Sequence, residues 1–165
     1  MNEGAVMGRK KKVPSYLYFD DSDSNFSMIT SNLLSSKEFQ ELSYAGRMFY
    51  IVLVTHKNTP EQRNCLYSTL KEYYRILCID KPDVDIKCEA GLYPKAIKHS
   101  MLFVIPQKQL AQYGYSPQYA SKLKKELIEH GFIRNKYGGK GKYNAWNENV
   151  TVYEFTNDWK KLDSS

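Results

Sequence analysis

The hydrophobic and polar positions between residues 101 and 115 predict a strand followed by a short helix. The apolar run Met101–Ile105 has the length of a buried strand. Pro106 suits the start of a short amphipathic helix, which should turn Leu110 and Ala111 inward. Gly114 tolerates a left-handed backbone, so we expect the helix to end there.

A second helix is predicted from Ser116 to His130. Ser116 is a typical N-cap, the proline that follows it suits the first helical position, and Gly131 comes directly after the helical pattern. Apolar residues recur at helical spacing and should face a core; they are Ala120, Leu123, Leu127 and Ile128.

A β-hairpin should follow this helix. Two β-rich runs, Phe132–Tyr137 and Val150–Phe155, are joined by a loop that opens with the glycine- and lysine-rich segment Gly138–Tyr143. A strand, a helix, a tight turn, a second helix and a hairpin, in that order, are typical of a winged helix-turn-helix. The expected fold class is therefore α+β, with a three-helix core and a β-hairpin wing.

The side of the second helix that faces away from the apolar stripe carries donors, acceptors and cations. Gln and Lys side chains can contact base edges in a major groove, and Ser can bind phosphate or base. The N-terminus of the helix would add backbone donors for a phosphate. The DNA-binding residues predicted here are Ser116, Gln118, Tyr119, Ser121, Lys122 and Lys125. The alternative is an ordinary solvated face, balanced by Glu126 and Glu129.

The hairpin favours the DNA-binding interpretation. No acidic residue lies between Glu129 and Glu148, and this interval contains four more predicted contacts, Arg134, Lys136, Lys140 and Lys142. A glycine-rich loop can approach a backbone closely, and its lysines can line phosphates or enter a minor groove. The aromatic residues beside them can stack on sugars or pack the hairpin, and we expect packing for Trp146.

Residues 26–80 are predicted to form the N-terminal helical part of a single domain that extends to residue 160. Phe26–Ile29 resembles a short strand, and Ser36 suits the cap of a helical turn. Ser43 should cap the run Ala45–His56, which is apolar on every side and therefore fits either a buried helix or a buried strand. Its length and its cap favour a helix, the first of the winged-helix fold.

A long helix should then be inserted into the minimal fold. The run Thr59–Gln62 supplies an N-cap, a proline and the glutamine of a capping box. The apolar stripe behind it runs to Cys78 and comprises Leu66, Leu70, Tyr73, Tyr74 and Leu77, and Pro82 should end the helix. The remaining face can pack on the core, which we favour, or form a homodimer contact. Residues 79–100 are predicted to be a connector with a short strand over Val84–Cys88.

Charge indicates a polyanionic partner. The chain has 165 residues, a net charge of +6 and a pI of about 9.1. This excess of positive charge suits binding to nucleic acid and would also attract the protein to acidic membrane surfaces. Residues 1–25 are predicted to be a disordered tail with a basic cluster, Arg9–Lys12, and an acidic one, Asp20–Asp23. The alternative for the basic cluster is an arm that reaches phosphates beside the main site.

Other classes of protein find little support in the sequence. No apolar run has the length of a membrane span, and Met1–Tyr18 lacks the apolar region of a signal peptide, so we expect a cytoplasmic protein. The three cysteines are irregularly spaced, which favours reduced thiols, and with His99 they match no zinc pattern. No catalytic triad or phosphate-binding loop is present, so neither an enzyme nor a cofactor is expected.

Two sets of residues resemble known proteins. The first resembles the start of winged-helix domains in Gram-positive plasmid replication initiators and related proteins of conjugative elements; it comprises Leu33, Leu34, Ser36, Glu38, Phe39, Leu42, Ser43 and Arg47. The second is similar to the helix–glycine–strand signature of many winged-helix regulators; it comprises Tyr115, Ser116, Lys122, Leu123, Leu127, Gly131, Phe132 and Ile133.

The resemblance implies a protein that binds double-stranded DNA at an origin or transfer site of a mobile element. It would place Gln118, Tyr119, Ser121, Lys122 and Lys125 on the recognition helix, and Lys136, Lys140 and Lys142 on the wing. Initiators usually carry a further domain, and the 59–78 helix is an addition, so we expect a replication or conjugation accessory rather than a complete initiator. A transcriptional regulator of the same fold is one alternative, and a winged-helix protein-interaction module without DNA contact is another.

Overall fold

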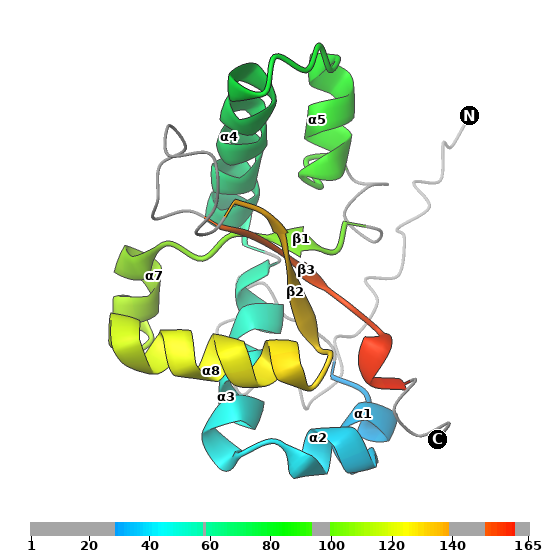
Figure 1. Cartoon of the computed structure of the whole chain (residues 1–165), viewed down its shortest axis with the longest axis vertical. Helices are drawn as coiled ribbons and strands as arrows, with labels where there is room; N and C mark the ends of the chain where they lie inside the picture. Colours follow the sequence, from blue (N-terminus) through cyan, green and yellow to red (C-terminus); the bar gives the residue numbers. More distant parts are fainter. Residues whose placement is uncertain (1–28, 58, 94–99, 139–150, 161–165) are drawn as a thin grey trace, which may run out of the picture.

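The computed structural model describes residues 29–57, 59–93, 100–138 and 151–160. Within these ranges the chain forms seven helices and a three-stranded antiparallel sheet, which confirms the α+β class and is compatible with a winged helix. The sheet crosses the middle of the molecule, with helices α4 and α5 on one side of it and helices α3, α7 and α8 on the other (Figure 1).

Hydroxyl side chains cap the first three helices, α1 (Ser31–Ser35), α2 (Lys37–Glu41) and α3 (Tyr44–Lys57), with Thr30 as the N-cap of α1. Ser36 caps α2 as predicted, because its hydroxyl accepts from the backbone N–H of the third helical residue. The hydroxyl of Ser43 does the same for α3, so the apolar run is a helix and not a strand. The strand expected over Phe26–Ile29 is not found at Ile29, and its other residues lie outside the described ranges.

Helix α4 (Pro60–Ile76) begins where the sequence predicts and ends earlier than it predicts. Thr59 accepts from the backbone N–H of Gln62, but the capping box is incomplete because the Gln62 amide is fully buried and makes no hydrogen bond to a described residue. The helix ends through Cys78, which has a left-handed backbone with φ of 53°, and not at Pro82.

The strand predicted over Val84–Cys88 is wrong, because these residues belong to helix α5 (Asp83–Glu89). Pro82 precedes the helix, two aspartates lie in its first turn and Lys87 lies in its last turn, an arrangement that favours a helix dipole. Its single buried residue, Ile86, packs toward α4. A helix with one buried residue has no repeating apolar pattern in its sequence. The charged residues at its two ends were therefore the signal that could have predicted it.

The second half of the chain follows the predicted order. Its elements are β1 (Leu102–Phe103), α7 (Gln107–Gln112), α8 (Pro117–Glu129), β2 (Ile133–Tyr137) and β3 (Val152–Phe155). Two apolar assignments are wrong: Ala111 is exposed, and Ile128 is 37% exposed. Each lies one position beyond a buried leucine, and the core-facing side of its helix is too narrow to include it.

The sheet has the strand order β1-β3-β2 and separates two cores. Side chains alternate along β1, so Phe103 faces α3 and α8 while Leu102 faces α4 and α5. Val152 joins the second core together with Leu66 and Leu70 of α4. The apolar stripe of the inserted helix therefore packs on the sheet, and the use of its remaining face, for core packing or for a homodimer contact, stays a prediction.

The C-terminal segment folds back on the core at Trp159. The Trp159 ring stacks on Phe132, with centroids 5.5 Å apart, and its backbone N–H donates to the carbonyl of Gly131. Gly131 has φ of 74°, and a Cβ atom there would lie 2.8 Å from the Trp159 nitrogen. This position therefore requires glycine both for its backbone conformation and for the close approach of the C-terminal segment.

Candidate nucleic-acid interface

The outward face of α8 is open to solvent. Ala120, Leu123 and Leu127 are buried and fix the inner side of the helix. The six residues predicted to bind DNA from this helix are all exposed, namely Ser116, Gln118, Tyr119, Ser121, Lys122 and Lys125. Apart from Ile128, the sequence therefore identified the sides of this helix correctly, and its outward face is available to a partner.

Helix α8 is fixed against α3 by a carboxylate. Glu126 Oε1 accepts from the backbone N–H of Ser43 at 2.6 Å, and Glu126 Oε2 accepts from the Ser43 hydroxyl at 2.9 Å. A Cβ atom on Gly46 would lie 2.9 Å from this carboxyl group, so the glycine leaves room for it. Glu126 thus binds the backbone N–H and the hydroxyl of the residue that caps α3, and it is not a solvated counter-charge to the lysines.

The first turn of α8 carries an aromatic pair that is anchored in the core. Tyr115 meets the buried Phe49 edge to face, with ring centroids 4.9 Å apart. Tyr119 stacks on Tyr115 with centroids 6.2 Å apart and an interplanar angle of 22°. The backbone N–H of Tyr119 donates to the hydroxyl of Ser116, the N-cap of the helix. The pair extends from the core to the exposed face of the helix.

The lysines of α8 differ in their surroundings. In the described parts of the chain Lys122 makes no ion pair, whereas Lys125 lies 3.7 Å from Glu129 in an exposed pair that contributes little stability. Lys124 is half-buried, with its ammonium group 5.3 Å from the centroid of the Tyr153 ring. Lys122 is therefore the cation of α8 that is most available to a phosphate or a base.

The hairpin cations are less available than the sequence suggests. Arg134 Nε donates to Glu154 Oε2 at 2.5 Å, and Lys136 Nζ lies 3.6 Å from the same oxygen. Arg134 and Glu154 are directly opposite each other in the β2–β3 register, and their pairing raises the pKa of Arg134. Glu154 lies outside the acid-free interval of the sequence because it belongs to β3, the strand that pairs with β2. Lys140 and Lys142, with most of the predicted loop, lie outside the described residues.

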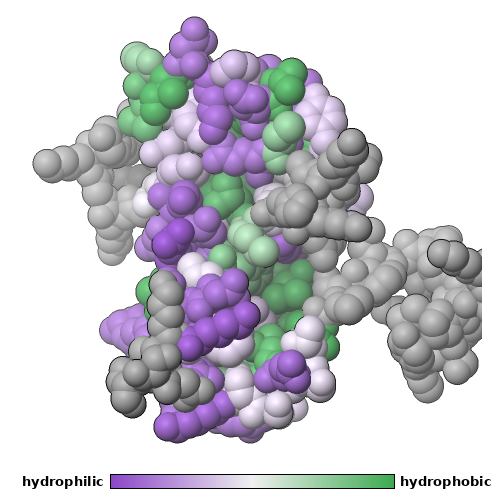
Figure 2. Space-filling model, turned by 90° about the vertical axis from the view of Figure 1, so that its right-hand side faces the viewer, coloured by the Kyte–Doolittle hydropathy of each residue, from purple (hydrophilic) through white to green (hydrophobic). Residues whose placement is uncertain are grey.

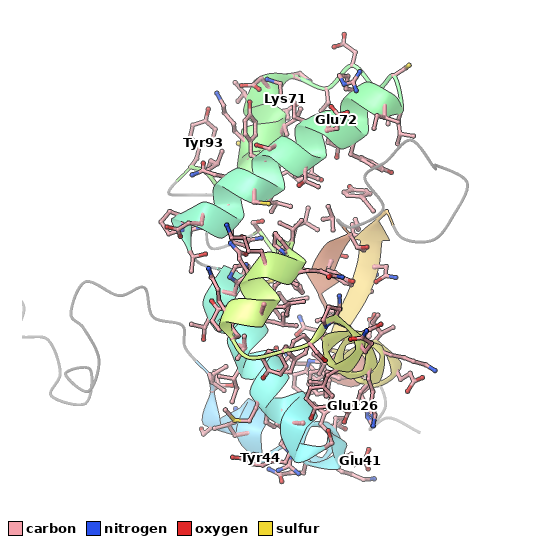
Figure 3. All side chains as sticks on the ribbon, turned by 90° about the vertical axis from the view of Figure 1, so that its left-hand side faces the viewer. Glu41, Tyr44, Lys71, Glu72, Tyr93 and Glu126 are labelled. Carbon is pink, nitrogen blue, oxygen red and sulfur yellow. The ribbon has the colours of Figure 1, made fainter. Side chains whose placement is uncertain are left out.

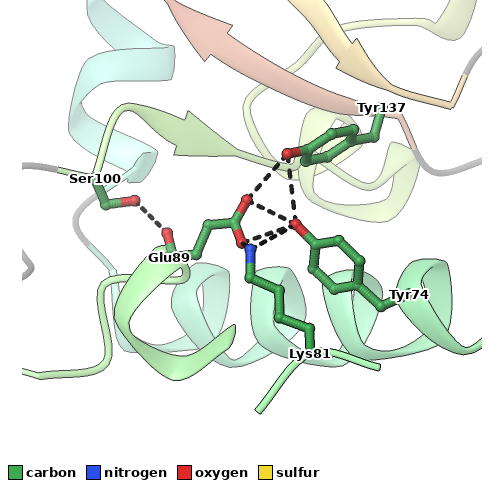
Figure 4. Close-up of polar contacts among 5 residues, drawn as sticks. All are labelled: Tyr74, Lys81, Glu89, Ser100 and Tyr137. Atoms are coloured by element: carbon green, nitrogen blue, oxygen red, sulfur yellow. Dashed lines mark hydrogen bonds and ion pairs between the residues drawn. The ribbon is translucent and has the colours of Figure 1, made fainter. Parts of the chain in front are cut away.

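A polar cluster that the sequence did not reveal joins the hairpin to the inserted helices (Figure 4). The Glu89 carboxylate accepts from Tyr74 at 2.9 Å, from Tyr137 at 3.1 Å and from Lys81 at 2.5 Å. Ser100 donates to the Glu89 carbonyl at 2.8 Å. Burial raises the pKa of Tyr74 to about 12 and also raises that of Tyr137, so both donate as neutral phenols at neutral pH.

An open groove of about 560 Å³ lies between α4 and α5. Its cations are already paired with neighbouring acids, since Lys71 and Lys87 both contact Asp83 and Lys81 contacts Glu89. Within the described ranges no three Asp, Glu, His or Cys residues are placed to hold a metal ion. His56 is buried, with Nδ1 3.4 Å from the Tyr113 hydroxyl, and His130 caps the end of α8.

Comparisons with known proteins give no relative: no family model, no curated protein and no solved structure matches the chain. None of the helices in the described parts of the chain has the length and apolar character needed to cross a bilayer.

Proposed function

We propose that this chain is a winged-helix protein that binds double-stranded DNA. Helix α8 would lie in a major groove, and the β2–β3 hairpin would lie over the adjacent backbone or minor groove. The order β1, α7, α8, β2 and β3, with α3 packed against α8, supports this assignment because it is the order of a winged helix-turn-helix.

The observation that carries the proposal is the exposed polar face of α8. A recognition helix must present donors, acceptors and cations that no other part of the molecule covers. Gln118, Ser121 and Lys122 are exposed on that face, and Lys122 is unpaired among the described residues. The net charge of +6 adds a long-range attraction for duplex DNA.

The mechanism proposed is binding without chemistry. Lysines would neutralise phosphates and release counterions, which supplies most of the affinity, while a few side chains on α8 would select the sequence. Arg134 and Lys136 are secondary contacts in this account, since each would have to leave Glu154 or share it with a phosphate. We further propose a cytoplasmic role at an origin or transfer site of a mobile element; a role in transcriptional control is the alternative.

A protein-interaction module is the rival from another class, and the hairpin favours it. Glu154 neutralises the cations at the base of the wing, and apolar side chains are exposed elsewhere, such as Tyr44 at 78% and Val84 at 58%. On the face drawn in Figure 2, apolar residues occur in several patches among polar ones. Dispersed apolar residues are common on monomeric proteins, so we favour DNA binding.

Selection from a random duplex library tests the proposal. The full chain should enrich a defined sequence. Footprinting on that sequence should show protection of a major groove and reduced cleavage of the DNA backbone beside it. Enrichment of no sequence, together with binding that does not change with salt, would contradict DNA binding and support the interaction module.

A further inference from the structure

The aromatic pair at the start of α8 suggests which base feature the helix contacts. Tyr119 is the third residue of the helix and is 44% exposed. Residues near the N-terminus of a recognition helix are those that contact base edges. The Tyr119 hydroxyl can donate or accept a hydrogen bond, whereas its ring is apolar and suits the one apolar group in the major groove, the C5-methyl of thymine.

The position of the Tyr119 ring is set before any ligand binds. Its backbone is held by the hydrogen bond to the Ser116 cap at 3.3 Å. Its ring lies nearly parallel to that of Tyr115, whose own ring packs on Phe49, a residue with no exposed surface. A side chain fixed in this way loses little rotamer freedom on binding, so a small apolar contact adds fully to the affinity.

We propose that Tyr119 is a specificity residue that selects thymine through its methyl group; this rests on the DNA-binding function proposed above. The neighbouring residues of the same face would contact other features of the bases. Gln118 and Lys122 carry the hydrogen-bond donors that distinguish purines, and neither offers an apolar end group. Tyr119 is the aromatic residue of the described α8 face, so methyl recognition falls to it.

Replacement of single thymines by deoxyuridine isolates the methyl group, because uracil keeps every hydrogen-bonding atom of thymine. The probe is the duplex enriched by the full chain, with each thymine replaced in turn, and anisotropy titrations give the dissociation constants. Burial of one methyl group corresponds to about a 3- to 5-fold change in affinity. We expect this loss at one or two thymines for the wild-type protein.

Variants assign that loss to a residue. Tyr119→Phe keeps the ring and should keep the sensitivity to deoxyuridine, whereas Tyr119→Ala should bind the two duplexes equally. Tyr93→Ala is the matched control, because Tyr93 is 39% exposed and lies at the opposite end of the molecule from Glu126 and α8 (Figure 3). This control should bind as the wild type does. Circular dichroism confirms that each variant is folded.

The outcomes separate this inference from the function on which it rests. An enriched duplex with no deoxyuridine-sensitive thymine, or one whose sensitivity persists in Tyr119→Ala, would overturn the assignment of Tyr119 while leaving DNA binding intact. A chain that enriches no duplex and shows no salt-dependent binding would overturn both. Sensitivity that is lost only in Tyr119→Ala supports both.

Discussion

The carboxylate of Glu126 on α8 accepts two hydrogen bonds from Ser43, the residue that caps α3. One side chain thereby binds the N-cap residue of α3 and fixes the helix that we propose to enter DNA. The contact is possible because residue 46 has no side chain. The orientation of the exposed α8 face therefore depends on a pair of residues that do not belong to that face.

Gly46 and Glu126 should be energetically coupled. Alanine is favoured over glycine within a helix by about 1 kcal/mol, so Gly46→Ala should stabilise the protein by about that amount when Glu126 is absent. In the wild-type background the new methyl group displaces the carboxylate from Ser43 and costs about 1–3 kcal/mol in charge-assisted hydrogen bonds. A double-mutant cycle in urea, with Glu126→Ala as the second change, measures the coupling. Additive effects would show that the carboxylate moves aside without cost.

The Glu89 cluster should stabilise the junction between the hairpin and the inserted helices. Glu89→Gln leaves Lys81 and two phenols with a weaker acceptor, and we expect it to lower the free energy of unfolding by about 1–3 kcal/mol. Glu72→Gln breaks an exposed pair with Arg75 and should change stability little. Equal effects of the two substitutions, measured by urea denaturation, would contradict a structural role for the cluster.

Protonation of His56 should destabilise the fold at acid pH. Burial lowers the pKa of this side chain below 6.5, so the folded protein resists the charge that the unfolded chain accepts. The histidine is neutral in both states above pH 6.5, and stability should fall as the pH drops through the window below that value. His56→Asn should reduce this dependence. Thermal melts between pH 8 and pH 5 would test it; the same slope in the wild type and in His56→Asn would contradict it.

Release of the hairpin cations should strengthen DNA binding. Glu154→Gln frees Arg134 and Lys136 for phosphates, and we expect the slope of log affinity against log salt to steepen by about one or two units. Glu72→Gln changes the net charge by the same amount at a distance from the hairpin (Figure 3) and serves as the control. Should both variants steepen the slope alike, net charge and not the hairpin would be responsible.

Local signals in the sequence predicted much of this fold. The predicted N-caps are confirmed at Ser116, Thr59 and Ser36. They could be predicted because an N-cap contacts only residues within its own helical turn. Helix α5 was missed because its seven residues bury only Ile86 and so leave no periodic pattern. The apolar stripe located the end of α4 near Cys78, but not the left-handed backbone of that residue, because a glycine is the usual signal for it.

The site was predicted less completely because its electrostatics depend on contacts between distant segments. The exposed face of α8 follows from helical spacing alone, and that prediction was confirmed. The partners of the charged residues do not follow from spacing. Glu126 pairs with a residue 83 positions away, and Arg134 of the hairpin pairs with Glu154 on the neighbouring strand. Counting acids along the chain therefore overestimated the free positive charge of the hairpin.

The affinity of Lys122→Ala for duplex DNA, compared with that of Lys71→Ala, decides whether α8 is the DNA-binding helix. Both changes lower the net charge by one, but Lys122 lies on the exposed face of α8 and Lys71 lies at the far end of the molecule on α4 (Figure 3). Anisotropy titrations of the enriched duplex and of a scrambled duplex should show that Lys122→Ala costs about 1–3 kcal/mol and relaxes the preference between them. Lys71→Ala should leave both affinities almost unchanged. Equal losses in the two variants, or binding unaffected by either, would contradict the assignment of α8 as the DNA-binding helix.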